Sequence, residues 1–270
     1  MGITTVAGLL IATLGIIGGF VVEGGSIASL VNIPGFLIVV VGTLGATVLS
    51  FPLDQLKSVP RSYARVLRGA GGVRPREMSG RLVAMADKAR REGLLSLEDE
   101  AQDIGDDFAR KGLMLMIDGT DPEALKSIME IEIDGAAERA AGEAEVFRAG
   151  SGFAPTLGVL GAVLGLIQVL GGLGGDVAAL GHGIAVAFVA TFYGVGFANV
   201  ILLPMATKLG VIAAEEGVTR QMILEGVLSI QAGDNPRIVR EKLQSFLPPG
   251  ERTSEDDGGV GGAVGERAAA

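Results

Sequence analysis

The stretch AGSGFAPTLGVLGAVLGLIQVLGGLGG, residues 149–175, contains no Asp, Glu, Lys or Arg. After a single charge at Asp176, residues 177–207 are again free of charged side chains. An α-helix rises about 1.5 Å per residue, so roughly 20 apolar residues cross the approximately 30 Å of hydrocarbon in a bilayer. Both stretches exceed that length. They predict two consecutive transmembrane helices.

The N-terminal part of the chain repeats this pattern at residues 1–22 and 24–53. The four charge-free stretches hold 110 of the 270 residues, although the chain carries 22 Lys and Arg and 31 Asp and Glu. Their continuous apolar character excludes the alternating strands of a membrane barrel. No basic residue precedes the first stretch, so we interpret it as a retained helix and not as a signal peptide. The predicted spans are Ile3–Val22, Ile33–Phe51, Phe153–Leu173 and Gly183–Met205.

The distribution of Lys and Arg predicts the orientation of these spans. The short links at 23–32 and 174–182 contain neither residue, whereas basic residues flank the opposite ends of the spans. These are Lys57, Arg61, Arg65, Arg68, Arg139, Arg148 and Lys208. We therefore expect the segment between the second and third spans, and both termini, to be cytoplasmic. The cluster that starts at Lys57 is typical of anchoring beside anionic lipid.

The long segment between the second and third spans is predicted to be helical. Apolar residues recur at helical spacing at Leu82, Met85, Ala86 and Ala89, and again at Leu125, Ile128, Met129 and Ile133. Breaks are expected at 69–72, at Gly93 and at 119–122, where Asp121 precedes Pro122 as an N-cap. Asn235 before Pro236 is a similar start signal.

The predicted fold class is an all-α integral membrane protein, with four transmembrane helices and a large helical cytoplasmic insert between the second and third. The expected divisions are two transmembrane helices in 1–53, a cytoplasmic helical domain in 54–150, two transmembrane helices in 151–208, cytoplasmic C-terminal helices in 209–247 and a disordered tail in 248–270. The tail is expected because it consists mostly of Gly, Ala and polar or charged residues and contains few large apolar ones.

The polar residues of the spans are the candidates for an ion path. An ionisable residue inside a membrane is costly and therefore points to function, yet none of the four spans contains a carboxylate. Thr191, Tyr193 and Asn199 lie in the fourth span. His182, the single histidine, lies at the edge of that span, where an interfacial residue without a relay role is the simpler interpretation. An ion relay in this chain alone would lack its acid, so we expect a partner.

Other classes of function find little support. The chain has no Cys and no phosphate-binding glycine motif, and its one His leaves no metal-ligand cluster, so neither an enzyme nor a metal site is expected. A net charge of −9 disfavours nucleic-acid binding. A self-contained transporter is disfavoured because no inverted repeat or intramembrane charge marks a substrate site.

Small residues and prolines mark the last two spans. Gly158, Gly161 and Gly165 share one face of the third span, and a second small-residue face follows Gly183, Ala187, Thr191, Gly194 and Ala198. Such stripes let helices approach closely in lipid. Pro155 is expected near a helix start, where proline is tolerated, whereas Pro204 frees a carbonyl and permits a kink.

These residues carry a resemblance to a known family. The segments PTLGVLGAVLG (155–165), AVAFVATFYG (185–194) and PMATKL (204–209) resemble the third and fourth transmembrane helices of the MotA/PomA family, the flagellar motor stator A subunits. Residues 90–99, RREGLLSLED, resemble a cytoplasmic motif of that family with a basic and an acidic residue eight positions apart. The resemblance covers about residues 1–245.

The resemblance implies a function and partners. Arg90 and Glu98 match the charges that engage the rotor protein FliG, and Glu132 is a fainter candidate for the same surface. Pro155 and Pro204 match prolines tied to conformational change, and Thr191 matches a pore-facing threonine. The ion-binding Asp belongs in this family to the single transmembrane helix of MotB or PomB. The A subunits form a pentameric ring around two such chains in the bacterial inner membrane, and no cofactor is implied beyond the coupling ion.

The sequence leaves two alternatives within this superfamily: which ion drives the protein, and whether it is a motor subunit or an energy transducer. Sodium-driven relatives carry a Thr where this chain has Ala162, and a methyl group cannot replace water around sodium, so protons are favoured over sodium. An energy transducer of the ExbB/TolQ type, which also surrounds a partner's helix, is the alternative function. Those proteins usually have three spans, so the fourth charge-free stretch favours the motor subunit.

Overall fold

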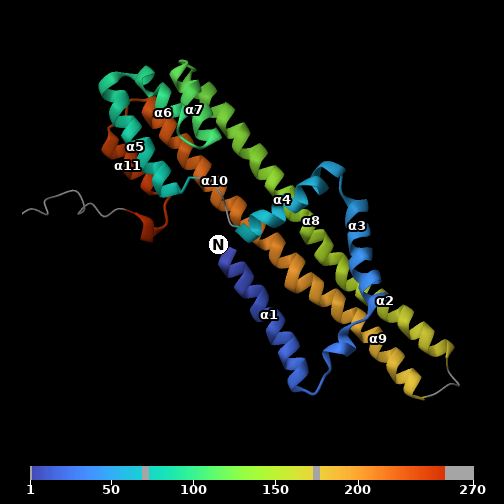
Figure 1. Cartoon of the computed structure of the whole chain (residues 1–270). Helices are drawn as coiled ribbons and strands as arrows, with labels where there is room; N and C mark the ends of the chain where they lie inside the picture. Colours follow the sequence, from blue (N-terminus) through green and yellow to red (C-terminus); the bar gives the residue numbers. More distant parts are fainter. Residues whose placement is uncertain (1, 69–72, 173–176, 253–270) are drawn as a thin grey trace, which may run out of the picture. The chain divides into compact units, whose positions relative to one another are not determined.

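The regular structure of the described residues is entirely helical. The computed structural model describes residues 2–68, 73–172 and 177–252 (Figure 1). Four helical segments are long and apolar enough to cross a membrane, namely Thr4–Val22, Ile33–Ser50, and stretches within Pro122–Gly171 and Leu180–Gln231. The predicted all-α membrane fold with four spans and a helical insert is confirmed.

The chain divides into two compact units. The first is Met1–Gly71 with Glu132–Gly217, and the second is Gly72–Ile131 with Val218–Ala270. This division differs from the boundaries expected at residues 54, 151 and 209. The reason is that two long helices, α8 (Pro122–Gly171) and α10 (Leu203–Gln231), continue from one unit into the other without a break.

The N-terminal half of the first unit contains the first two spans. Helix α1 (Gly2–Val22) is followed by a 3₁₀ turn, η1 (Ile27–Leu30). The second span consists of α2 (Ile33–Phe36), the π-helical segment η2 (Leu37–Val41) and α3 (Gly42–Ser50). Helix α4 (Leu53–Arg68) comes next and contains Pro60.

The last two spans lie within longer helices. The third span occupies the C-terminal part of α8, which ends at Gly171, so Leu173 and the link at 173–176 lie outside the described residues. The fourth span begins in α9 (Val177–Gly196), six residues before the expected start at Gly183, and continues through the π-helical segment η4 (Phe197–Leu202) into α10. The expectation that Pro155 stands near a helix start is wrong, because α8 already begins at Pro122.

The second unit is a bundle of shorter helices around the end of α10. It contains α5 (Pro75–Glu92), η3 (Leu94–Leu97), α6 (Glu98–Gln102), α7 (Asp107–Ile117), the first turns of α8, α11 (Pro236–Gln244) and η5 (Pro249–Glu251). The predicted N-caps are confirmed: Asp121 Oδ1 accepts from the backbone N–H of Glu123, and Asn235 Oδ1 from that of Arg237. The turn Pro249–Glu251 occupies the start of the predicted tail, and residues 253–270 lie outside the described ranges.

Apolar side chains at helical spacing form the core of the second unit. Of the predicted core positions, Leu82, Met85, Ala86, Leu125 and Met129 are buried. Ile128 instead is 37% exposed. Gly112 and Gly226 allow close packing, because a Cβ on Gly112 would lie 2.6 Å from Met129 Cε, and one on Gly226 would lie 2.8 Å from Leu82 Cδ1.

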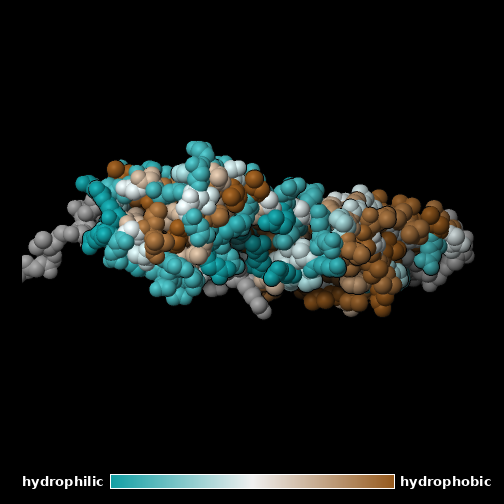
Figure 2. Space-filling model, turned by 90° about the horizontal axis from the view of Figure 1, so that it is seen from above, coloured by the Kyte–Doolittle hydropathy of each residue, from teal (hydrophilic) through white to brown (hydrophobic). Residues whose placement is uncertain are grey.

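The surface of the spans is apolar. Leu14, Val22 and Leu49 are 69%, 89% and 90% exposed. Figure 2 shows hydrophobic residues concentrated over the transmembrane helices, whereas the rest of the visible face is mostly hydrophilic with smaller hydrophobic patches. An exposed apolar belt of this kind is stable only when lipid or another apolar helix covers it.

Candidate functional site

Helices α8 and α9 pack against each other through their backbones. A Cβ on Gly158 would lie 3.1 Å from Ala190 O and 3.2 Å from Gly194 Cα. One on Gly194 would lie 2.5 Å from Ala154 O, a separation that real Cβ atoms do not reach. Two main chains can approach this closely only when neither residue has a side chain. The predicted contact between the small-residue faces is confirmed.

The same packing continues towards the other end of the span. A Cβ on Gly161 would lie 2.9 Å from Ala190 Cβ, and one on Gly165 would lie 3.0 Å from Ala187 Cβ. Ala187 and Ala190 are 3% and 2% exposed. The two spans therefore form one tightly packed pair along three successive glycines.

Thr191 lies on the packed face of α9. Its Oγ1 reaches Gly158 O at 3.5 Å, so the hydroxyl turns towards α8 and not back to its own helix. The spans contain no carboxylate, and the described part of the chain holds no group of three metal-ligating side chains. The two packed spans therefore carry hydroxyl groups but no carboxylate.

Tyr193 fastens the link between the first two spans to α9. Its hydroxyl donates to Leu30 O and accepts from the backbone N–H of Asn32 at 3.0 Å. Its ring meets the edge of Phe36 with a centroid distance of 6.4 Å. Tyr193 is predicted from the sequence as an ion-path residue. In the structure its hydroxyl forms hydrogen bonds with backbone atoms of the link between the first two spans.

Asn32 also connects the link between the first two spans to α9, and it is not among the residues predicted from the sequence. Its Oδ1 accepts from Gly35 N at 3.0 Å as the N-cap of α2, and its Nδ2 donates to Val186 O at 3.2 Å. The side chain is 7% exposed. A related signal was present, because Asn32 stands two residues before Pro34 at a helix start, whereas Asn235 directly precedes Pro236.

The two prolines differ in their surroundings. Pro204 is the second residue of α10, which follows the π-helical segment η4, and a π-turn accommodates the carbonyl that a helical proline leaves without its usual N–H partner. Pro155 lies inside α8, where its Cα is the atom that a Cβ on Gly194 would meet at 3.2 Å. Pro155 therefore lies at the α8–α9 contact, whereas Pro204 lies in α10, beyond the end of α9.

A charged cluster joins three helices of the first unit. Arg65 on α4 donates from Nη2 to both carboxylate oxygens of Glu216 at 2.8 Å, and its Nη1 lies 3.7 Å from Glu143 Oε2. Ser62 Oγ donates to Glu143 Oε2 at 2.6 Å. Arg65, expected only as a lipid-facing anchor, therefore ties α4 to α8 and α10. No spacing in the sequence could identify partners 78 and 151 positions away.

Arg90 and Glu98 flank a helix break in the second unit. Arg90 lies in the last turn of α5, Gly93 ends that helix with φ 86°, and Glu98 begins α6. The predicted interruption at Gly93 is confirmed. Both side chains are exposed, and neither forms an ion pair or hydrogen bond with the described residues. Two unpaired opposite charges remain available to a partner.

An ion pair holds the two sides of this break together. Lys88 Nζ donates to Glu100 Oε1 at 2.8 Å, which joins α5 to α6. This hydrogen bond is the main cause that raises the pKa of Lys88 above its ordinary value, and the negative charges of Glu100, Glu92 and Asp99 add to it. The pair therefore connects the helix that carries Arg90 to the helix that carries Glu98.

The remaining residues singled out from the sequence lie on α8 and α9. Glu132 is half-buried on α8 and belongs to the first unit, whereas Arg90 and Glu98 belong to the second. Ala162 is half-buried on α8, next to Gly161. His182 is exposed in α9.

Comparison with known proteins gives the class of protein that this fold and this pair of helices define. Residues 100–222 match the MotA/TolQ/ExbB proton channel family, and residues 6–93 match the family of motility protein A N-terminal regions. The second match covers the first two spans and α5, the part of the chain that separates a motor subunit from a three-span transducer.

Individual relatives narrow the class. Motility protein A of Treponema phagedenis is 42% identical over 229 residues, which cover 85% of this chain and 88% of that protein. The chain therefore belongs to the motility protein A family, the A subunits of flagellar stators. Among solved structures, the MotAB stator complex of Bacillus subtilis matches with a TM-score of 0.87 and 35% identity, covering 92% of this chain and 98% of that one. The C. jejuni MotAB structure matches with a TM-score of 0.90 and 30% identity, covering 94% and 100%.

Proposed function

We propose that this chain, as a stator A subunit, forms an ion channel together with a MotB-type subunit and converts ion flow into torque on the flagellar rotor. The observation that supports this is the pairing of α8 and α9: two spans in backbone contact that contain no carboxylate. Such a pair can form the wall of an ion path but lacks a titratable group, which a partner's helix would supply. The role is conduction and force transmission, with no catalysed reaction.

The missing carboxylate and the matching solved structures also support an assembly with a partner chain. The solved structures that match are complexes of MotA with MotB, which supports a single-span MotB-type partner for this chain. We expect several copies, five by the family pattern, to surround two partner chains in the inner membrane. Lys and Arg at one end of the spans support cytoplasmic termini and a cytoplasmic insert. Arg90 and Glu98 would then face the rotor protein FliG.

We expect the coupling ion to be the proton. Ala162 supplies no oxygen, and the Tyr193 hydroxyl is committed to the link between the first two spans. A sodium ion must exchange its hydration water for protein oxygens, whereas a proton needs only a titratable group and a chain of hydrogen bonds.

Co-expression tests the assembly. The chain would be produced with the MotB-type protein encoded beside it, purified through a tag on that partner, and scored for co-elution and for restored swimming in cells that lack both native stator genes. Co-elution with restored swimming supports the proposal. A chain that elutes alone and restores nothing contradicts it.

Swimming speed at fixed pH, with sodium replaced by potassium, tests the ion. Unchanged speed, together with loss of swimming when a protonophore is added, supports proton coupling. Strict dependence on sodium contradicts that choice and leaves the stator role intact.

A further inference from the structure

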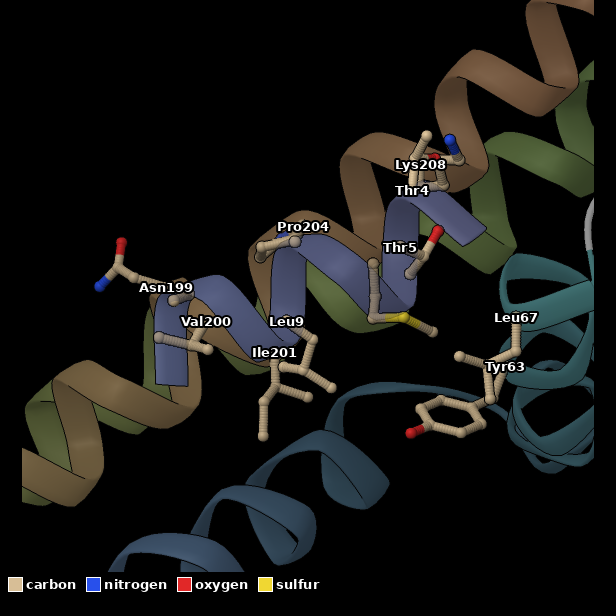
Figure 3. A pocket seen from close by; sticks show the side chains of 13 residues that line it. Thr4, Thr5, Leu9, Tyr63, Leu67, Asn199, Val200, Ile201, Pro204 and Lys208 are labelled. Atoms are coloured by element: carbon tan, nitrogen blue, oxygen red, sulfur yellow. The ribbon is translucent and has the colours of Figure 1, made fainter. Parts of the chain in front are cut away.

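A pocket of about 390 Å³ lies in the first unit between α1, α4 and the η4–α10 junction (Figure 3). Most of its wall is apolar, from Gly8, Leu9 and Ala12 of α1, Leu67 of α4, and Val200, Ile201 and Met205 of η4 and α10. Its polar groups are few. The pocket shares no lining residue with the α8–α9 contact.

Three of the polar side chains that line the pocket lie together at one end. Figure 3 shows Thr4, Thr5 and Lys208 together, and Asn199 and Val200 at the opposite end. Lys208 is half-buried and forms no ion pair or hydrogen bond with the described residues. Thr5 Oγ1 is buried without a hydrogen-bond partner. Among the described residues that line the pocket there is one cation, Lys208, and no carboxylate. This end therefore offers an unpaired positive charge and a hydroxyl to an anion.

The dimensions of the pocket restrict what can fill it. Thr4 to Ala12 on α1 and Asn199 to Lys208 on the facing helix each extend about 12–13 Å along the helix axis. A pocket of this length, apolar along most of its wall and positively charged near one end, suits a slender apolar chain with an anionic end.

We propose that this pocket binds one anionic phospholipid, with its phosphate beside Lys208, Thr4 and Thr5 and an acyl chain along Leu9 and Ile201. Lys208 belongs to the group of basic residues at one end of the spans, where basic pockets between transmembrane helices meet anionic headgroups. The lipid would lie directly against Pro204, the proline that follows the π-helical segment. The inference does not depend on the identity of the coupling ion or of the rotor partner.

Two substitutions test separately whether the pocket binds the lipid headgroup and whether it binds the acyl chain. Lys208→Gln removes the cation and leaves the apolar wall. Gly8→Leu fills the wall, because a Cβ on Gly8 meets no atom within 4 Å. The matched control is Gly15→Leu, since Gly15 also has open space around its Cβ, lies two turns further along α1 and is not part of the pocket wall. Lys57→Gln removes an exposed cation of α4 that pairs with Asp54 instead.

The test counts retained lipid by native mass spectrometry. The full chain, purified with its partner subunit in detergent, would be titrated with phosphatidylglycerol or with phosphatidylcholine of the same acyl chains. We expect about one phosphatidylglycerol per copy of this chain and at least fivefold weaker retention of phosphatidylcholine. Lys208→Gln should lower phosphatidylglycerol retention about fivefold, since one Lys near an anionic surface contributes about that factor. Gly8→Leu should abolish retention of both lipids, and Gly15→Leu and Lys57→Gln should match the wild type.

Three outcomes overturn the inference. Equal retention of the two lipids by the wild type shows that no anionic site exists. Equal loss in Gly8→Leu and Gly15→Leu shows that lipid binds the outer surface of α1 and not the pocket. Absence of bound lipid, combined with failure of Gly8→Leu but not Gly15→Leu to assemble, shows that protein fills the pocket. Lys208→Gln keeps the test decisive if Gly8→Leu does not fold.

Discussion

Arg65 and Glu216, 151 residues apart in the chain, form a forked hydrogen bond in which Arg65 Nη2 lies 2.8 Å from each carboxylate oxygen. The two side chains are only 32% and 21% exposed, so water replaces little of this interaction when it is broken. Glu143, 23% exposed, shares the same guanidinium. The cluster anchors α4 to both long helices of the first unit.

Replacing Arg65 should destabilise the protein. Arg65→Gln removes the guanidinium that Glu143 and Glu216 share, and we expect a loss of about 1–2 kcal/mol after allowance for partial exposure. Thermal unfolding of the detergent-solubilised chain, followed by circular dichroism, measures the effect. Lys57→Gln is the control, because Lys57 and Asp54 are 73% and 95% exposed.

Charge exchange gives a sharper version of that test. The double variant Arg65→Glu with Glu216→Arg keeps the opposite charges and should recover part of the stability that either single reversal loses. If the double variant is as unstable as the sum of the two single variants, the ion pair does not contribute the stability assigned to it.

The contact between α8 and α9 predicts that Gly194 tolerates no side chain. Gly194→Ala would place a Cβ 2.5 Å from Ala154 O, a backbone atom that cannot rotate away. The helices must separate, and we expect a loss of about 1–3 kcal/mol together with loss of swimming. Gly196→Ala, two residues along the same helix, meets no atom within 4 Å and should be neutral or slightly stabilising. Equal behaviour of the two variants in thermal unfolding would show that close approach of the backbones is unimportant.

Much of this arrangement could be predicted from the sequence. The four spans, the contact between small-residue faces, the break at Gly93 and the caps at Asp121 and Asn235 depend on local composition or on helical spacing, which a sequence displays directly. The fit between Gly158 and Gly194 is of the same kind, because both residues belong to stripes that repeat along one helix face.

What could not be predicted depends on contacts between distant residues or on helix continuity. Nothing in the sequence pairs Arg65 with Glu216, or the Tyr193 hydroxyl with the backbone of Leu30 and Asn32. Pro155 was expected near a helix start because proline in a helix interior normally breaks or kinks the helix, whereas the 50-residue helix α8 continues through it.

The Tyr193 hydroxyl should stabilise the link between the first two spans. Tyr193→Phe removes the hydrogen bonds to Leu30 and Asn32 but keeps the edge contact with Phe36, so we expect a loss of about 1–2 kcal/mol. Tyr63→Phe is the matched control, because Tyr63 is 44% exposed and its hydroxyl bonds to none of the described residues. Unfolding midpoints compare the two variants. If only swimming changes and the midpoint of Tyr193→Phe stays at the wild-type value, the hydroxyl belongs to the ion path instead.

Lys242 gives the second unit a dependence on alkaline pH. Its Nζ lies 2.9 Å from Glu225 Oε1 and 3.1 Å from Asp234 Oδ2, contacts that raise the pKa of Lys242 above its ordinary value of 10.5. A raised folded-state pKa means that the stabilisation is fully present below pH 10.5 and is lost as pH rises through the folded-state value. Wild type should therefore unfold at a higher temperature than Lys242→Gln at pH 8, and this difference should shrink at pH 11.5. A difference that stays constant across that range would exclude the charge of Lys242 as its cause.

Arg90 is the residue on which the proposed rotor contact depends most. It is exposed and unpaired among the described residues, whereas the adjacent Arg91 pairs with Asp87 at 2.8 Å. Arg90→Glu should therefore reduce torque without affecting assembly, because Arg90 forms no ion pair or hydrogen bond with the described residues. Tethered-cell rotation measures torque, and co-purification with the partner subunit measures assembly. Arg91→Glu controls for a charge reversal at the same end of α5 and should leave torque closer to the wild-type value.

A compensating reversal on the rotor protein should restore part of the torque to Arg90→Glu, since the complementary charges would again attract each other. Normal torque in the single variant would remove Arg90 from the rotor contact, and failure of every compensating reversal would show that its role is not electrostatic.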